Sequence, residues 1–61
     1  MNKEQFAKII KEKREALNLS QEAFGSKIGV SWITIWRWEN QREAPNEIIM
    51  KLWIDNIKDL K

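Results

Sequence analysis

The residues best suited to chemistry lie in one short stretch, GVSWITIWRWEN, which runs from Gly29 to Asn40. It holds three of the chain's four tryptophans, and Arg37 lies between two of them. A guanidinium donates paired hydrogen bonds, and indole rings supply large apolar surfaces. Such side chains recognise a partner without making or breaking covalent bonds. The stretch therefore predicts recognition chemistry.

Covalent and metal chemistry have few candidate residues in this chain. Its 61 residues include no histidine and no cysteine, so the usual zinc ligands, thiol nucleophiles and imidazole bases are missing. The sequence also lacks a paired-carboxylate pattern and a glycine-rich phosphate loop. We expect a protein that is not an enzyme and has no catalytic residue, metal, cofactor or small-molecule substrate.

The composition is that of one small globular domain, which we expect to span residues 1–61. Apolar residues make up 43% of the chain and charged residues 33%, a balance typical of folded proteins. The net charge of +2 is compatible with nucleic-acid binding but does not establish it. No apolar run approaches membrane-spanning length and no signal-peptide pattern occurs, so we expect a soluble cytoplasmic protein without a membrane partner.

Hydrophobic periodicity predicts helices joined by short turns, without strands. The expected helices cover residues 3–17, 21–28, 32–40 and 47–60. The pair Asp55-Asn56 could bend or interrupt the last of them. Side-chain oxygens suited to capping helix N-termini precede the second, third and fourth helices, at Ser20, Ser31 and Asn46.

The two middle helices have the spacing of a helix-turn-helix unit. Gly25 lies inside the first of them, where a glycine usually permits close approach of another backbone. Gly29 lies in the turn, where we expect the left-handed backbone conformation. The core positions predicted for this unit are Phe24, Ile28, Val30, Ile35 and Trp38.

The segment LSQEAFGSKIGVSWITIWRWENQREAPN resembles the Cro/repressor-type helix-turn-helix family, also called the xenobiotic-response-element-like family. The resemblance implies an all-α, lambda-repressor-like fold, a compact bundle of four to five helices. The family usually has glycine at the position of Gln41, so the loop there is expected to differ in shape. The residues that carry the resemblance are Leu19, Ser20, Gln21, Phe24, Gly25, Gly29, Val30, Ser31, Ile35, Trp38, Glu39 and Pro45.

The resemblance implies a sequence-specific transcriptional regulator of phage-repressor, Cro-like or antitoxin-like type that binds double-stranded DNA. The helix over about 32–40 would lie in the major groove, and homodimers would form at least on DNA. Gln21 would contact a phosphate or support the third helix. Asn40 and Arg42 would hold phosphates. Glu39 would form a partly buried, structural ion pair with Arg14.

If Ile35 and Trp38 point inward, the third helix presents a mostly apolar outward face. Arg37 suits guanine, and Ile33 suits thymine methyl groups. For Trp32 and Trp36, three interpretations remain open: they line the edge of the DNA groove against sugar and methyl groups, they fold back over the first helix or the loop, or the Trp32/Ile33/Trp36 face binds a protein. The DNA-binding residues predicted for the chain are Gln21, Ser31, Trp32, Ile33, Thr34, Trp36, Arg37, Asn40 and Arg42.

The last helix carries an apolar stripe wider than one core-facing side requires. One part of the stripe should pack against the first helix. The remainder, around Trp53, Ile54 and Ile57, is the predicted contact of a two-fold homodimer.

Overall fold

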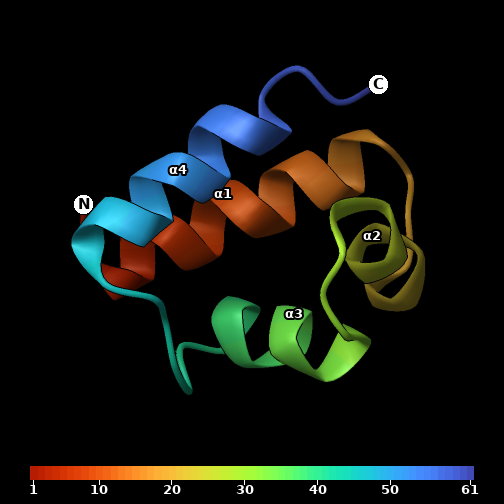
Figure 1. Cartoon of the computed structure of the whole chain (residues 1–61). Helices are drawn as coiled ribbons and strands as arrows, with labels where there is room; N and C mark the ends of the chain where they lie inside the picture. Colours follow the sequence, from red (N-terminus) through yellow and green to blue (C-terminus); the bar gives the residue numbers. More distant parts are fainter.

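Four helices without any strand make up the computed structural model, which describes all 61 residues. The helices are α1 (Lys3–Ala16), α2 (Gln21–Ile28), α3 (Trp32–Glu39) and α4 (Glu47–Ile57). Helix α4 runs beside α1, whereas α2 and α3 pack on each other and α3 also packs on α1 (Figure 1). None of these helices has the length and apolar character that a membrane crossing requires. The prediction of an all-α bundle is confirmed, with four helices.

Each helix begins at a side chain that satisfies a free backbone N–H group. Ser20 Oγ accepts from the Ala23 N–H at 3.0 Å, and Asn46 Oδ1 accepts from the Ile49 N–H at 2.9 Å. Ser31 does the same for α3, so all three predicted caps are confirmed. Because these bonds are local, they set where the helices begin independently of the core.

The core is one apolar cluster to which every helix contributes. Trp38 of α3 lies at its centre, with its ring edge-on to Phe6 of α1 at a centroid distance of 5.1 Å. Its other neighbour is Trp53 of α4, at 5.5 Å. Trp38 thus ties α3 to both long helices. The buried members of the cluster are Phe6, Ile10, Phe24, Ile35, Trp38, Met50 and Ile57.

Helix α4 differs from its prediction in both length and orientation. It ends at Ile57 and not at Leu60. Ile57 is only 1% exposed, so its assignment to a dimer contact is wrong. Trp53 and Ile54 are half-buried against the core, so they are not a free apolar surface either. The reason is that Met50 and Ile57, seven residues apart, both point inward and turn the opposite side of α4 outward.

Candidate functional site

The turn between α2 and α3 depends on its two glycines. A Cβ atom at Gly25 would lie 2.5 Å from the Val30 carbonyl oxygen, so any side chain there would force the backbone apart. Gly29 has a φ of 86°, in the left-handed region that glycine adopts at little cost. The Val30 N–H donates to the Gly25 carbonyl at 2.9 Å and closes the turn. Both glycine predictions are confirmed, and they fix α3 closely against α2.

Besides the glycine turn, a group of polar side chains holds α3 in place. We call it the Glu39 clamp, and it consists of Arg14, Gln21 and Glu39. Arg14 donates from Nε and Nη2 to the two carboxylate oxygens of Glu39, at 2.7 and 3.0 Å. Gln21 Nε2 also donates to Glu39, at 3.3 Å. Arg14 Nη1 donates to the Leu19 carbonyl at 3.0 Å. The clamp therefore joins α1, α2 and the end of α3 through one carboxylate that is 4% exposed.

Within the clamp, Arg14 keeps its positive charge over a wide range of pH. The hydrogen bond that Arg14 donates to Glu39 raises the pKa of Arg14 above its ordinary value, and burial opposes this only partly. A raised pKa means that the contribution of Arg14 to folding is fully present below the ordinary pKa of arginine. It is lost only as the pH rises through the higher pKa of the folded state. The guanidinium thus stays charged throughout the neutral range.

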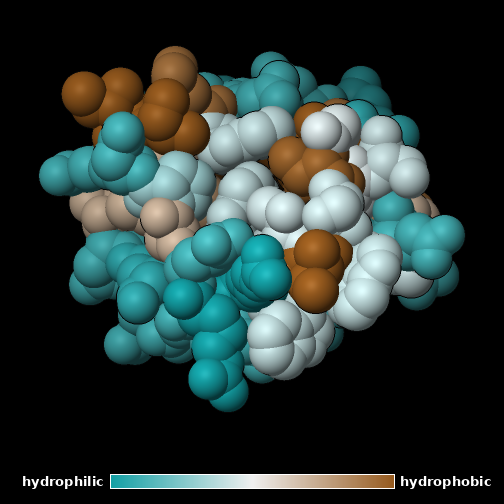
Figure 2. All heavy atoms as spheres, turned by 60° about the horizontal axis from the view of Figure 1, so that its bottom comes forward, coloured by the Kyte–Doolittle hydropathy of each residue, from teal (hydrophilic) through white to brown (hydrophobic).

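With its inner side fixed, α3 presents an apolar outward face. The exposed fractions are 52% for Trp32, 39% for Ile33 and 38% for Trp36. Figure 2 views the molecule from this side, and apolar and intermediate side chains form a continuous area across the middle of the view. Large apolar side chains left exposed together mark a surface that contacts another molecule.

Two guanidinium groups flank this face. Arg37 has a side chain 47% exposed, with Nη1 3.8 Å from a carboxylate oxygen of Glu43. The Arg42 guanidinium lies over the Trp36 ring, 6.0 Å from its centroid, in a cation–π arrangement. Both groups therefore lie beside the apolar surface, where they can meet an anionic partner.

The loop that carries Arg42 begins with an unusual backbone conformation. Gln41 has a φ of 58°, the left-handed region that favours glycine. Its N–H donates to the Trp38 carbonyl at 3.2 Å, and the Arg42 N–H donates to the Arg37 carbonyl at 2.8 Å. These two bonds close α3 as a glycine-type C-terminal motif. Gln41 thus takes the backbone conformation that glycine would supply most easily.

The structure divides the predicted binding residues by their surroundings. Trp32, Ile33, Trp36 and Arg37 are exposed on α3. The remaining polar residues already have partners within the domain. Gln21 belongs to the Glu39 clamp, Thr34 Oγ1 is 3.1 Å from Ser31 Oγ, and Asn40 Nδ2 donates to the Trp36 carbonyl at 2.9 Å.

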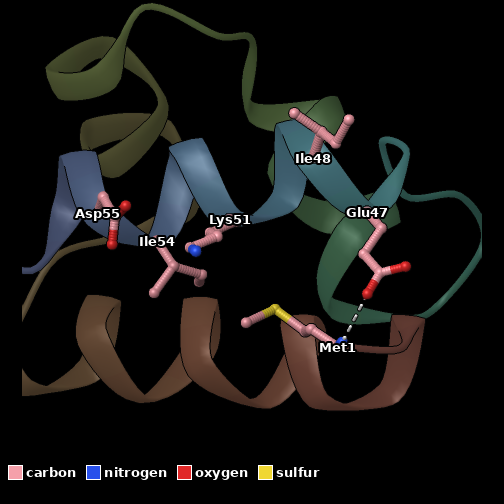
Figure 3. Close-up of a pocket in the computed structure, with 6 residues that line it drawn as sticks. All are labelled: Met1, Glu47, Ile48, Lys51, Ile54 and Asp55. Atoms are coloured by element: carbon pink, nitrogen blue, oxygen red, sulfur yellow. Dashed lines mark ion pairs between the residues drawn. The ribbon is translucent and has the colours of Figure 1, made fainter.

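Sequence reasoning missed a second exposed apolar surface, on α4. Ile48 is 73% exposed and Leu52 57%. Beside them, an open groove of about 500 Å³ lies between α4 and the start of the chain. Figure 3 shows Met1 reaching toward α4 in this groove, with its amino group 3.5 Å from Glu47. The apolar residues of α4 lie nearly all round the helix, so the sequence carries no clear signal that places Ile48 and Leu52 outward.

Comparison with known proteins supports the geometry of α2 and α3. The family model described as Helix-turn-helix, of the Cro/repressor type, matches residues 10–55, more than half of the chain. The chain belongs to this helix-turn-helix family. No match was found among curated proteins or among solved structures. The family is one of DNA-binding regulators and not of enzymes, so α2 and α3 form the helix-turn-helix unit of a DNA-binding regulator.

Proposed function

We propose that this helix-turn-helix protein is a sequence-specific transcriptional regulator, of repressor, Cro-like or antitoxin-like type. In this proposal α3 is the recognition helix and lies in the major groove of double-stranded DNA. The observation that carries it is the outward face of α3, which the Gly25 turn and the Glu39 clamp hold clear of the core. Arg37 and Arg42 supply positive charge beside that face.

The two arginines have different tasks in this proposal. Arg37 projects from the outward side of α3 and reads guanine through paired hydrogen bonds to O6 and N7. Its contact with Glu43 is long and exposed, so breaking that contact costs little. Arg42 and the start of the loop at Asn40 lie at the end of α3, where they hold phosphates and set the register of the helix.

The test is a salt-dependent binding assay on short duplexes selected from a random-sequence library. Wild-type affinity should fall steeply as salt rises, because phosphate contacts release counterions. Arg37→Ala should weaken binding by about 5- to 150-fold and relax the base preference at one position. Lys61→Ala is the matched control, because the C-terminus lies far from α3 (Figure 1). Absence of any salt-sensitive complex would overturn the proposal.

A second candidate function is a protein-interaction module on the same fold. The extent of apolar exposure at Trp32, Ile33 and Trp36 is the observation that favours it. Tryptophan fluorescence separates the two functions, because two of these residues are fluorescent. A signal that responds to duplex DNA and is reduced in Trp36→Ala supports DNA binding. A signal that responds to a partner protein and never to DNA supports the alternative.

We also propose that two copies of the chain associate through α4, at least on DNA. Ile48 and Leu52 form the apolar centre of the contact. Along one flank, Glu47, Lys51 and Asp55 alternate in charge at intervals of four residues. Two antiparallel α4 helices, offset by one turn, bring each Lys51 beside an acidic side chain of the other copy. The surface is therefore complementary to itself in charge as well as apolar.

Sedimentation of the free protein and of its complex with a palindromic duplex tests this dimer. Leu52→Glu should remove the dimer while leaving the helical content unchanged, because the side chain is exposed. Lys11→Glu, on the exposed side of α1, is the control and should leave the dimer intact. A wild-type protein that is monomeric both free and on the palindromic duplex would contradict the proposal.

A further inference from the structure

The outward face of α3 offers few free polar groups with which to read bases. Thr34 Oγ1 and Ser31 Oγ lie 3.1 Å apart and share a hydrogen bond. The amide nitrogen of Asn40 donates one of its two N–H groups to the Trp36 carbonyl at 2.9 Å, which ties this side chain to the end of α3. Arg37 is thus the main polar reader on this face.

Apolar groups occupy the rest of the same face. Ile33 and Trp36 are 39% and 38% exposed, on the side of α3 opposite the buried Ile35 and Trp38. The Arg42 guanidinium lies over the Trp36 ring, 6.0 Å from its centroid. Because the Glu39 clamp anchors the end of α3, this apolar surface cannot rotate toward the core.

The major groove displays one kind of apolar group at its base edges, the C5-methyl of thymine. Cytosine and uracil lack this methyl group, and 5-methylcytosine carries it at the same position. Burying one methyl-sized group against Ile33 or Trp36 is worth about a three- to fourfold change in affinity. An apolar reading surface therefore discriminates by methyl groups, and the effect multiplies with each one contacted.

We propose that the Ile33/Trp36 face of α3 recognises pyrimidine C5-methyl groups, so that the preferred duplex carries thymines beside the base contacted by Arg37. This inference rests on the proposed DNA-binding function and specifies the ligand of that site. It assigns the specificity to shape and apolar contact at these positions, with one guanine contact from Arg37 to fix the register.

The experiment uses a duplex selected from a random library with the full-length protein. Its thymines are then replaced by deoxyuridine, first within the site that the bound protein protects from nuclease cleavage. In a control duplex, only the thymines outside that site are replaced. Deoxyuridine removes the methyl group and keeps the hydrogen-bonding edge. With two or more methyl contacts, we expect at least tenfold weaker binding to the substituted site. The control duplex should bind like the original.

Two variants test whether the preference for thymine over deoxyuridine comes from the Ile33/Trp36 face. Ile33→Ala should bring the ratio of thymine to deoxyuridine affinity down by about three- to fourfold, because a methyl contact is lost. Arg37→Ala should weaken binding to both duplexes and leave that ratio unchanged. At a contacted position occupied by a cytosine–guanine pair, 5-methylcytosine should bind more tightly than cytosine.

The possible outcomes separate this inference from the function on which it rests. Salt-sensitive binding with equal affinity for thymine and deoxyuridine duplexes would overturn the methyl-reading inference alone. A ratio that Ile33→Ala and Trp36→Ala both leave unchanged would also overturn it, since the methyl contact would then lie elsewhere. Absence of salt-sensitive binding to any duplex would overturn both the inference and the proposed function.

Discussion

The outward faces of α3 and α4 are both apolar, yet their surroundings differ. On α3, Ile33 and Trp36 are flanked by two guanidinium groups, of which that of Arg42 lies over the Trp36 ring. On α4, Ile48 and Leu52 run beside a row of alternating charge. Exposed apolar area indicates that a surface has a partner, but the charges around it indicate which kind. Positive charge favours nucleic acid, and alternating charge favours a second copy of the chain.

The two helices also differ in what holds them. Helix α3 is anchored by the close backbone approach at Gly25 and by the hydrogen-bonded Glu39 clamp. Helix α4 depends on apolar packing through Met50, Trp53 and Ile57. Directional bonds fix the rotation of a helix about its axis, whereas apolar packing tolerates small changes in it. A helix that reads bases needs the first kind of support.

The largest expected effect comes from removing the clamp. Glu39→Ala should lower the free energy of unfolding by about 2–4 kcal/mol, because it leaves a partly buried Arg14 without its charge partner. Urea denaturation followed by circular dichroism measures this change. The control is Glu12→Ala on the exposed side of α1, expected to stay within about 0.5 kcal/mol. Equal stability of Glu39→Ala and wild type would remove the proposed difference in support between α3 and α4.

The next largest effect is on DNA affinity, where substitutions on the outward faces of α3 and α4 should differ. Trp36→Ala should weaken binding to a duplex with a single half-site by about five- to tenfold, since it removes apolar contact and the stacking partner of Arg42. Leu52→Ala should bind the same duplex like wild type, because α4 lies away from it in the proposed complex. Fluorescence anisotropy of a labelled duplex measures both. Equal losses in the two variants would contradict the division of function between the faces.

The salt dependence of DNA affinity tests whether the positive charges beside α3, and not those on α4, contact DNA. Arg42→Gln should reduce the slope of log affinity against log salt by about one, as expected for loss of one phosphate contact. Lys51→Gln, on α4, should leave the slope unchanged on a single half-site. The measurement is anisotropy at several salt concentrations. If Lys51→Gln lowers the slope as much as Arg42→Gln does, α4 also contacts DNA.

The smallest expected effect concerns the backbone of the loop after α3. Gln41→Gly should raise the free energy of unfolding by about 0.5–1 kcal/mol, because glycine takes the left-handed conformation without the steric cost of a Cβ atom. Gln41→Ala keeps that cost and should stay within about 0.5 kcal/mol of wild type. Thermal denaturation of the three proteins ranks them. A Gln41→Gly protein no more stable than wild type would show that this conformation carries no strain.

Much of the fold could be predicted because its signals are local. The N-caps at Ser20, Ser31 and Asn46 and the left-handed turn at Gly29 depend on neighbouring atoms in the chain. The face of α4 could not be predicted in the same way. Its apolar residues lie nearly all round the helix, so periodicity does not distinguish the core side from the exposed side. From the sequence, Trp53, Ile54 and Ile57 are therefore expected to point outward, whereas packing turns them inward.

The sequence by itself determined that the chain is helical, where its first three helices lie, and that a helix-turn-helix unit occupies its middle. Propensity, capping and glycine conformation act over a few residues, so these features need no distant partner. Only the tertiary structure decided the rest. The family resemblance implies that Arg14 pairs with Glu39, 25 residues away, but only the packing of the helices decides the two hydrogen bonds between them and brings Gln21 to the same carboxylate. Docking of α4 on α1 likewise buried Ile57 and exposed Ile48 and Leu52, since burial depends on which neighbours a helix finds.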